Sequence, residues 1–121
     1  MGTHNRLESL VEAIKGGDIM GAFEEFYDEN VSMQENTNPP TLGKEANRAR
    51  EQQFLDSVKE WKSLSIDAHA VEEMGDGAVS FIEYQFEFVN NDNQPVHYQQ
   101  VAVQRWRGGK VVAERFYYGT E

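Results

Sequence analysis

The sequence predicts an α+β fold in which three N-terminal helices pack on the concave face of a strongly curved, mostly antiparallel sheet. Apolar residues recur at helical spacing in the first half of the chain, and they alternate with polar residues in the second half. Glycine-rich turns separate the alternating runs, as in β-hairpins. The expected order of elements is α-α-β-α-β-β-β-β, and such a sheet encloses a cone-shaped interior with an internal pocket.

The first two helices are separated by a glycine turn. Over residues 5–15, apolar side chains recur at the i, i+3, i+4 and i+7 positions of an amphipathic helix, and Gly16 and Gly17 end the pattern. Asp18 can then cap a second helix, which we expect to end near Asp28. The apolar face of this second helix is broad enough to lie on a sheet.

A short strand and a loop precede the third helix. Residues 31–34 alternate as a strand does, and the two consecutive prolines that follow can continue neither a helix nor a strand ladder. Glu35 is therefore expected where the strand meets the loop. Residues 43–61 return to helical spacing, which predicts the longest helix of the chain, with Trp61 at its end.

Four further strands complete the predicted sheet. Glycines supply the positive backbone φ angles that tight hairpins need, and an Asn-rich segment forms a longer turn. We expect these strands at residues 64–70, 80–88, 98–106 and 111–118.

Composition limits the function of this single domain, which spans residues 1–121. Eleven basic against 21 acidic residues give a net charge of −10, which repels nucleic acid and anionic membranes. The chain has no cysteine, which excludes disulfides and a cysteine nucleophile, and no metal-ligand spacing, so neither a metal nor a cofactor is expected. No apolar run approaches a membrane span, and the N-terminus lacks a signal-peptide core, so we expect a cytoplasmic protein.

Two segments resemble the SnoaL-like branch of the nuclear transport factor 2-like superfamily. Residues 30–46 (NVSMQENTNPPTLGKEA) resemble its strand, proline-rich loop and glycine-initiated helix. Residues 94–118 (QPVHYQQVAVQRWRGGKVVAERFYY) resemble its final hairpin, with a Gly-Lys turn and a terminal aromatic trio. Together with Gly17 and Asp18 between the first two helices, the resemblance covers essentially the whole chain.

This resemblance implies a pocket between the sheet and the helices, and often a homodimer formed through the sheet. Members of the superfamily include ketosteroid isomerases, polyketide cyclases, dehydratases and epoxide hydrolases, besides many non-catalytic binding modules. The resemblance therefore implies a fold without selecting one activity.

The strand register that the family implies turns one set of side chains into the pocket. The polar residues Glu83, Gln85 and Glu87 alternate with this set, which agrees with that register. We expect the pocket to bind a small organic ligand, polar or partly apolar, through the following residues: Tyr84, Tyr98, Gln100, Gln104, Phe116, Tyr118 and Trp61.

The resemblance also suggests a catalytic role for Glu35. This residue aligns with the carboxylate that is the general base of the ketosteroid isomerases and the acid/base group of the cyclases. A desolvated carboxylate at the rim of an apolar cavity suits proton abstraction next to a carbonyl. The alternative is that Glu35 is a solvated loop residue of a very acidic chain.

Glu114 is the second candidate catalytic residue, because the family register turns it inward beside Phe116. If Glu35 and Glu114 both reach the cavity, repulsion between them would keep one protonated, which gives an acid and a base. The alternative is a structural ion pair of Glu114 with Arg48 or Arg50, since buried charges are usually paired.

Two departures weigh against the ketosteroid isomerase reaction. Leu10 stands where those enzymes have a hydrogen-bonding tyrosine, and Ala102 stands where they have a protonated carboxylic acid. Without these donors, stabilisation of an enolate in the isomerase manner is not expected. His69 and His97 are expected on the convex side and His4 in the N-terminal segment, so no histidine is expected in catalysis.

Two functions therefore remain open. The first is a small-molecule-binding domain, as an isomerase, cyclase or hydrolase that uses Glu35 and Glu114. The second is a non-catalytic ligand-binding or dimerisation module, which a pocket filled by Phe54, Trp61 and Trp106 would favour.

The convex face predicts a homodimer through the sheet. Glu83 and Glu87 could meet Arg105 and Arg115 of a two-fold-related copy. Between these charges, the register leaves an apolar strip that a solvated face would not need: Phe81, Val101, Val103, Val111 and Tyr117.

Overall fold

The computed structural model describes residues 2–119 and contains three helices and a six-stranded sheet. The elements are, in chain order, α1 (Thr3–Lys15), α2 (Ile19–Phe26), β1 (Tyr27–Glu35), β2 (Thr41–Leu42), α3 (Lys44–Asp56), β3 (Val58–Met74), β4 (Gly77–Asn90), β5 (Pro95–Arg107) and β6 (Lys110–Tyr118). The predicted α+β class with three helices and a mostly antiparallel sheet is confirmed. Strand β2 was not predicted.

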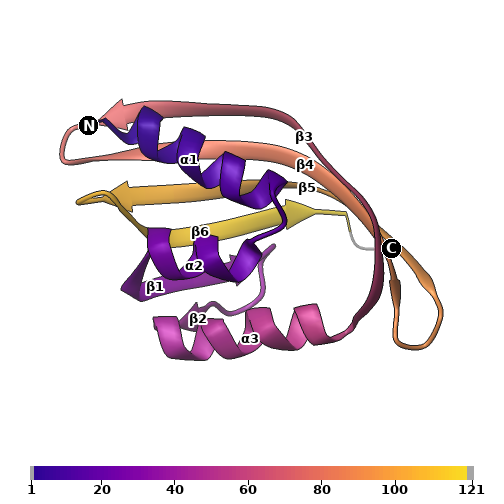
Figure 1. Cartoon of the computed structure of the whole chain (residues 1–121). Coiled ribbons are helices and arrows are strands. Elements are labelled where there is room, and N and C mark those ends of the chain that lie inside the picture. Colours follow the sequence, from indigo (N-terminus) through magenta and orange to yellow (C-terminus); the bar gives the residue numbers. More distant parts are fainter. Residues whose placement is uncertain (1, 120–121) are drawn as a thin grey trace.

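The sheet has the strand order β2-β1-β6-β5-β4-β3, and only β1 and β6 run parallel. Figure 1 shows helices α1 and α2 lying across one face, while the long strands β3 and β4 bend beyond the end of α1. We call the face that carries these helices the inner face and the opposite face the outer face. None of the helices within residues 2–119 has the length and apolarity that crossing a membrane requires.

Helix α2 is shorter than the sequence predicts, because Tyr27 already belongs to β1. Phe26 ends the helix, and Tyr27 has extended backbone angles and pairs with Val111 of β6. The predicted helix end near Asp28 and the strand at residues 31–34 are therefore corrected. Pairing with a distant strand decides this boundary, since local spacing favours continuing the helix.

Helix α3 also ends early, at Asp56, and is no longer than α1. The predicted continuation to Trp61 is wrong, because the chain enters β3 at Val58. Trp61 lies opposite Phe88 of β4, and its ring contacts the Phe54 ring at 6.3 Å between centroids. Aromatic packing across the two long strands thus replaces the last turn of the expected helix.

A β-bulge reverses the faces of β3. Ile66 lies opposite Tyr84, but Ala68 lies opposite Glu83, so one extra residue of β3 is left between these pairs. His69 consequently lies opposite Ile82 on the inner face, where its Nε2 atom is 2.7 Å from a carboxylate oxygen of Glu8 of α1. The expectation that His69 faces the convex side is wrong for this reason.

A second β-bulge, in β6, shows that the predicted position of Val111 on the convex face is wrong. Arg105 pairs with Ala113, whereas Trp106 pairs with Val111, so Val112 is the extra residue of β6. Val111 is therefore fully buried in the core and does not belong to the outer face.

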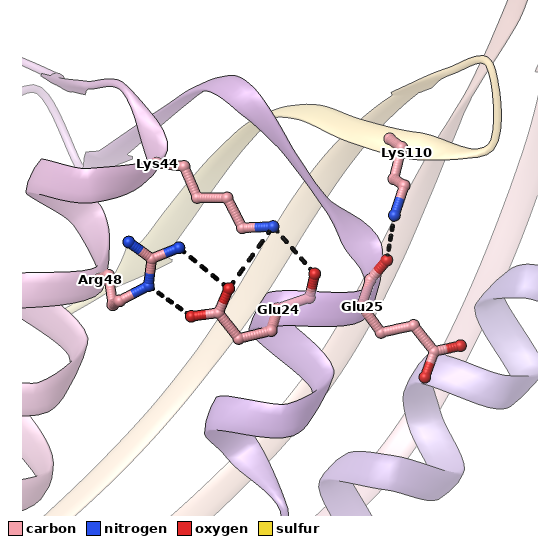
Figure 2. Close-up of polar contacts among 5 residues, drawn as sticks. All are labelled: Glu24, Glu25, Lys44, Arg48 and Lys110. Atoms are coloured by element: carbon pink, nitrogen blue, oxygen red, sulfur yellow. Dashed lines mark hydrogen bonds and ion pairs between the residues drawn. The ribbon is translucent and has the colours of Figure 1, made fainter.

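Hydrogen bonds and ion pairs connect helix α2 to α3 and β6 (Figure 2). Lys44 of α3 is buried, and its ammonium donates to the backbone oxygen of Glu24 at 2.9 Å. Arg48 of α3 pairs with the carboxylate of Glu24, and Lys110 of β6 donates to the backbone oxygen of Glu25. These contacts hold α2 between α3 and β6, which positions the wall of the cavity described next.

Candidate functional site

A cavity of about 500 Å³ lies between the helices and the inner face of the sheet. Its walls are mainly aromatic and aliphatic, and side chains from all three helices and from strands β1, β3, β4, β5 and β6 contribute. Among the residues expected at the site, the following line it: Glu35, Glu114, Tyr84, Tyr98, Gln100, Phe116, Tyr118 and Trp61. Gln104 does not, because it is fully buried behind Glu114.

The carboxylate of Glu114 is buried in the wall formed by β6, with 5% of the residue exposed. Its two oxygens accept hydrogen bonds from the Tyr27 hydroxyl at 2.6 Å and from the Gln104 amide at 2.7 Å. Burial raises the pKa of Glu114 to about 7, although both hydrogen bonds act in the opposite direction. Near neutral pH, Glu114 can therefore either release or take up a proton.

A chain of hydrogen bonds fixes the direction in which Gln104 points. The indole nitrogen of Trp106 can only donate, and it donates to the hydroxyl of Ser80 at 2.8 Å. The Ser80 hydroxyl then donates to the amide oxygen of Gln104 at 2.7 Å, which leaves the amide nitrogen to face Glu114. Gln104 is thus a fixed neutral donor to the carboxylate, and the residues behind it are buried.

Neither arginine that was considered as a partner of Glu114 contacts it. Arg48 pairs with Glu24 on the surface, and Arg50 pairs with Glu35. The structural ion pair expected as the alternative for Glu114 is therefore wrong. Its partners are neutral, so no cation compensates its charge when it is ionised.

Glu35 lies in a different environment at the end of β1. Its carboxylate pairs with the guanidinium of Arg50 and accepts a hydrogen bond from the Tyr118 hydroxyl at 2.6 Å, with 37% of the side chain exposed. This hydrogen bond raises the pKa of Tyr118 to about 12. The strong desolvation that suits a general base is thus found at Glu114 rather than at Glu35.

The two carboxylates start from neighbouring strands. Met33 of β1 lies opposite Glu114, and Glu35 lies opposite Phe116, so the two glutamates are offset by two residues across the parallel pair. This places their Cα atoms roughly 8 Å apart. The loop after Glu35 is held at this edge by Asn36, whose amide oxygen accepts from the backbone N–H of Tyr118 at 3.0 Å.

Sequence reasoning missed Glu51 of α3, which also lines the cavity. Burial raises the pKa of Glu51, and its charge in turn raises the pKa of Glu114. Its signal was present in the sequence, because Glu51 follows the buried Asn47 by four residues and precedes Phe54 by three, which puts all three on one face of a helix.

Tyr84 and Gln100 form a neutral polar pair across strands β4 and β5. The Gln100 amide donates to the Tyr84 hydroxyl oxygen, so the proton of that hydroxyl remains available to a ligand oxygen. Burial raises the pKa of Tyr84, and the negative charge of Glu114 raises it further. Tyr84 therefore stays a neutral donor at physiological pH.

The structure places the two apolar residues that were compared with the isomerase donors at or near the cavity. Leu10 lines the cavity and Ala102 is buried in β5. None of the three histidines lines the cavity, and His97 contacts Gln85 on the outer face. Within residues 2–119, no three His, Asp or Glu side chains gather closely enough to hold a metal ion.

The architecture is shared with proteins of known structure. A candidate SnoaL-like polyketide cyclase from Mesorhizobium loti is 23% identical, with a TM-score of 0.74 over 98% of this chain and 100% of that one. A candidate isomerase from Bacillus subtilis is 19% identical, with a TM-score of 0.75 over 98% of this chain and 90% of that one. At these identities the similarity establishes the fold.

Comparison of the sequence itself identifies the family. No curated protein matches the chain at a significant level. The profile of the SnoaL-like domain family matches residues 7–114, which includes most of α1 and every cavity-lining residue except Phe116 and Tyr118. The chain belongs to the SnoaL-like domain family of the nuclear transport factor 2-like superfamily.

Proposed function

We propose that this SnoaL-like domain binds a small organic carbonyl compound in its cavity and moves a proton on it with Glu114. The observation that carries the proposal is a buried carboxylate with a pKa of about 7 that faces an otherwise mainly apolar cavity. Carboxylates with this property transfer protons at neutral pH, because their ionised form is basic enough to abstract one. Of the isomerase, cyclase and hydrolase activities, this proposal favours those that transfer a proton at a carbon next to a carbonyl.

The roles follow from the contacts of each group. Ionised Glu114 takes a proton from the carbon beside the carbonyl and returns it to another position. Tyr84 can donate its hydroxyl proton to the oxygen that becomes negative, because this hydroxyl acts only as an acceptor in its bond with Gln100. Glu35, paired with Arg50, serves ligand orientation rather than proton transfer.

Deuterium uptake from D2O into the α-carbons of cyclohexanone and 1-tetralone, followed by NMR, tests this function. We expect uptake above the buffer rate that increases as the pH rises through about 7, because the ionised form of Glu114 is the base. The Glu114→Gln variant should lose about 100-fold or more of this rate. Glu83→Gln on the outer face is the matched control and should keep it. Equal rates for both variants would contradict the role of Glu114.

The second candidate, a non-catalytic binding module, is favoured by one observation. Leu10 and Ala102 leave the site without the two donors that support enolates in the isomerases, and the two neutral donors at Glu114, Tyr27 and Gln104, already bond to its carboxylate. Ligand binding without any deuterium uptake would select this function.

We also propose that two copies associate through the outer face. Phe81 and Tyr117 are 40% and 44% exposed, and Val103 and Val101 of β5 lie opposite them in the sheet. Sedimentation equilibrium at micromolar concentration should give twice the 13.9 kDa of the chain. Phe81→Lys should shift the population to the monomer, while Met74→Lys, at an exposed residue near the end of β3, should not. A monomeric unmodified protein would disprove the association.

A further inference from the structure

The charges around the cavity do not balance. The carboxylate of Glu51 lines it without a hydrogen bond or ion pair to any other described residue, and Glu114 has only neutral partners. Arg50 also lines the cavity and its charge lowers the pKa of Glu51, but its guanidinium is paired with Glu35. Glu114 is buried and Glu51 is half-buried, and carboxylates removed from water normally have a cationic or strongly donating partner. The described residues supply little positive charge to these two carboxylates.

The lysines at the cavity do not supply this charge. Lys15 and Lys62 contribute to its lining, but both are exposed, and the ammonium of Lys62 lies 3.1 Å from Glu60. Exposed ammonium groups are solvated and screened, so they contribute little to compensating a buried carboxylate. A cationic group on a bound ligand would stabilise the ionised form of these carboxylates, which otherwise take up a proton more readily than exposed ones.

Aromatic rings line the same cavity as Glu51. Phe54 stands one helical turn further along α3 and on the same face, and its ring meets the rings of Trp61 and Phe86 edge to face, at 6.3 and 6.0 Å between centroids. Trp61 and Phe86 are also 5.9 Å apart. All three rings line the cavity, and their mutual inclination of 63–77° turns ring faces in different directions around one space.

We propose that the ligand carries a protonated or quaternary amine, held between the carboxylate of Glu51 and the faces of Phe54 and Trp61. Ring faces attract cations through their quadrupole, and a carboxylate beside them supplies the counter-charge. The net charge of −10 also raises the local concentration of cations. This inference rests on the proposed ligand-binding function and adds to it the chemical class of the ligand, an amine with an apolar or aromatic body.

Three probes with one shared body and different charge test the inference: 3-phenylpropan-1-amine, 3-phenylpropan-1-ol and 3-phenylpropanoate. Binding is measured by isothermal titration calorimetry at pH 8, where the amine is protonated. We expect the amine to bind at least about tenfold more tightly than the alcohol, and the carboxylate to bind most weakly.

Matched variants then locate the site. Glu51→Gln should weaken amine binding about tenfold and leave the alcohol unchanged, while Glu45→Gln removes the same charge from an exposed, non-lining position of α3 and should change neither. Trp61→Leu, at a residue 42% exposed and thus tolerant of substitution, should weaken the amine more than the alcohol.

The outcomes separate this inference from the function on which it rests. Tighter binding of the alcohol or the carboxylate, or equal effects of Glu51→Gln and Glu45→Gln, would overturn the amine assignment and leave ligand binding intact. Failure of all three probes to bind would also overturn the amine assignment, whereas the proposed function is overturned separately, by the absence of deuterium uptake into the ketones.

Discussion

Glu35 and Glu114 occupy neighbouring parallel strands of one sheet and line one cavity, yet their surroundings differ. Glu35 is partly exposed and paired with Arg50, whereas Glu114 is buried and held only by neutral donors. An arginine partner preserves the charge of a carboxylate, while burial beside neutral groups makes its charge depend on pH. Both carboxylates line the cavity, so this shared location does not decide which of them can exchange protons near neutral pH. The hydrogen-bonding or ionic partner of each carboxylate and its burial decide it.

The largest expected effect on the free energy of unfolding comes from replacing Gln104, which donates a hydrogen bond to Glu114. Gln104→Leu removes the donor to its carboxylate and the acceptor of the Ser80 hydroxyl, both inside the core. We expect the free energy of unfolding at pH 8 to fall by about 3 to 5 kcal/mol, because buried polar groups lose their partners. Urea unfolding measures this loss. A loss of less than about 1 kcal/mol would contradict this expectation, because it would mean that water or a rearranged side chain replaces the hydrogen bonds of the Gln104 amide.

The second expected effect is a dependence of stability on pH. The pKa of Glu114 is about 7 in the folded protein, whereas the ordinary value of a glutamate is 4.5, so the folded state binds more protons than the unfolded state between these values. The contribution of Glu114 to the free energy of unfolding should therefore decrease by about 3 kcal/mol from pH 4 to pH 8. Glu114→Gln should remove this decrease. The same slope in the variant would assign the titration to another group.

Arg50→Gln, at the Glu35 pair, should have a smaller effect. Both side chains are partly exposed, so water can solvate the carboxylate that is left behind. We expect a loss below about 1 kcal/mol in urea unfolding at pH 8, in contrast to Gln104→Leu. A loss comparable with that of Gln104→Leu would erase the distinction between the two carboxylates.

The smallest expected effect is on the ionisation of Tyr118. Its hydroxyl donates to Glu35, and this hydrogen bond raises the pKa of Tyr118 to about 12. In Glu35→Gln, the tyrosine pKa should move towards its ordinary value of 10.0, which NMR titration of ¹³C-labelled tyrosine can follow. An unchanged Tyr118 would show that burial maintains its pKa.

Much of the fold was predictable from local pattern. The alternation in β4 placed Tyr84 and Phe86 on the face that lines the cavity and Glu83 on the other, because a strand with one buried face must alternate. Helix α1 was found by its apolar stripe, which lies in the core as Leu7, Leu10 and Val11. These features depend on neighbours within a few residues.

Element boundaries and bulges were not predictable in the same way. Nothing local distinguishes Trp61 as a strand residue, since its aromatic partner Phe88 belongs to another strand. The bulges that reverse the faces of β3 at His69 and of β6 at Val111 depend on pairing with distant strands. Local alternation, continued unbroken, therefore assigned both residues to the wrong face.

The sequence alone predicted the α+β class, because periodicity indicates which face of each element is apolar. The motifs of residues 30–46 and 94–118 indicated the family, and the register of that family indicated most of the lining of the cavity. Only the tertiary structure decided the partners of each carboxylate. Tyr27 reaches Glu114 across 87 positions of the chain, and Arg50 bonds to Glu35 rather than to Glu114. Protonation depends on burial and on charges within a few ångströms, and the packing of distant segments sets both.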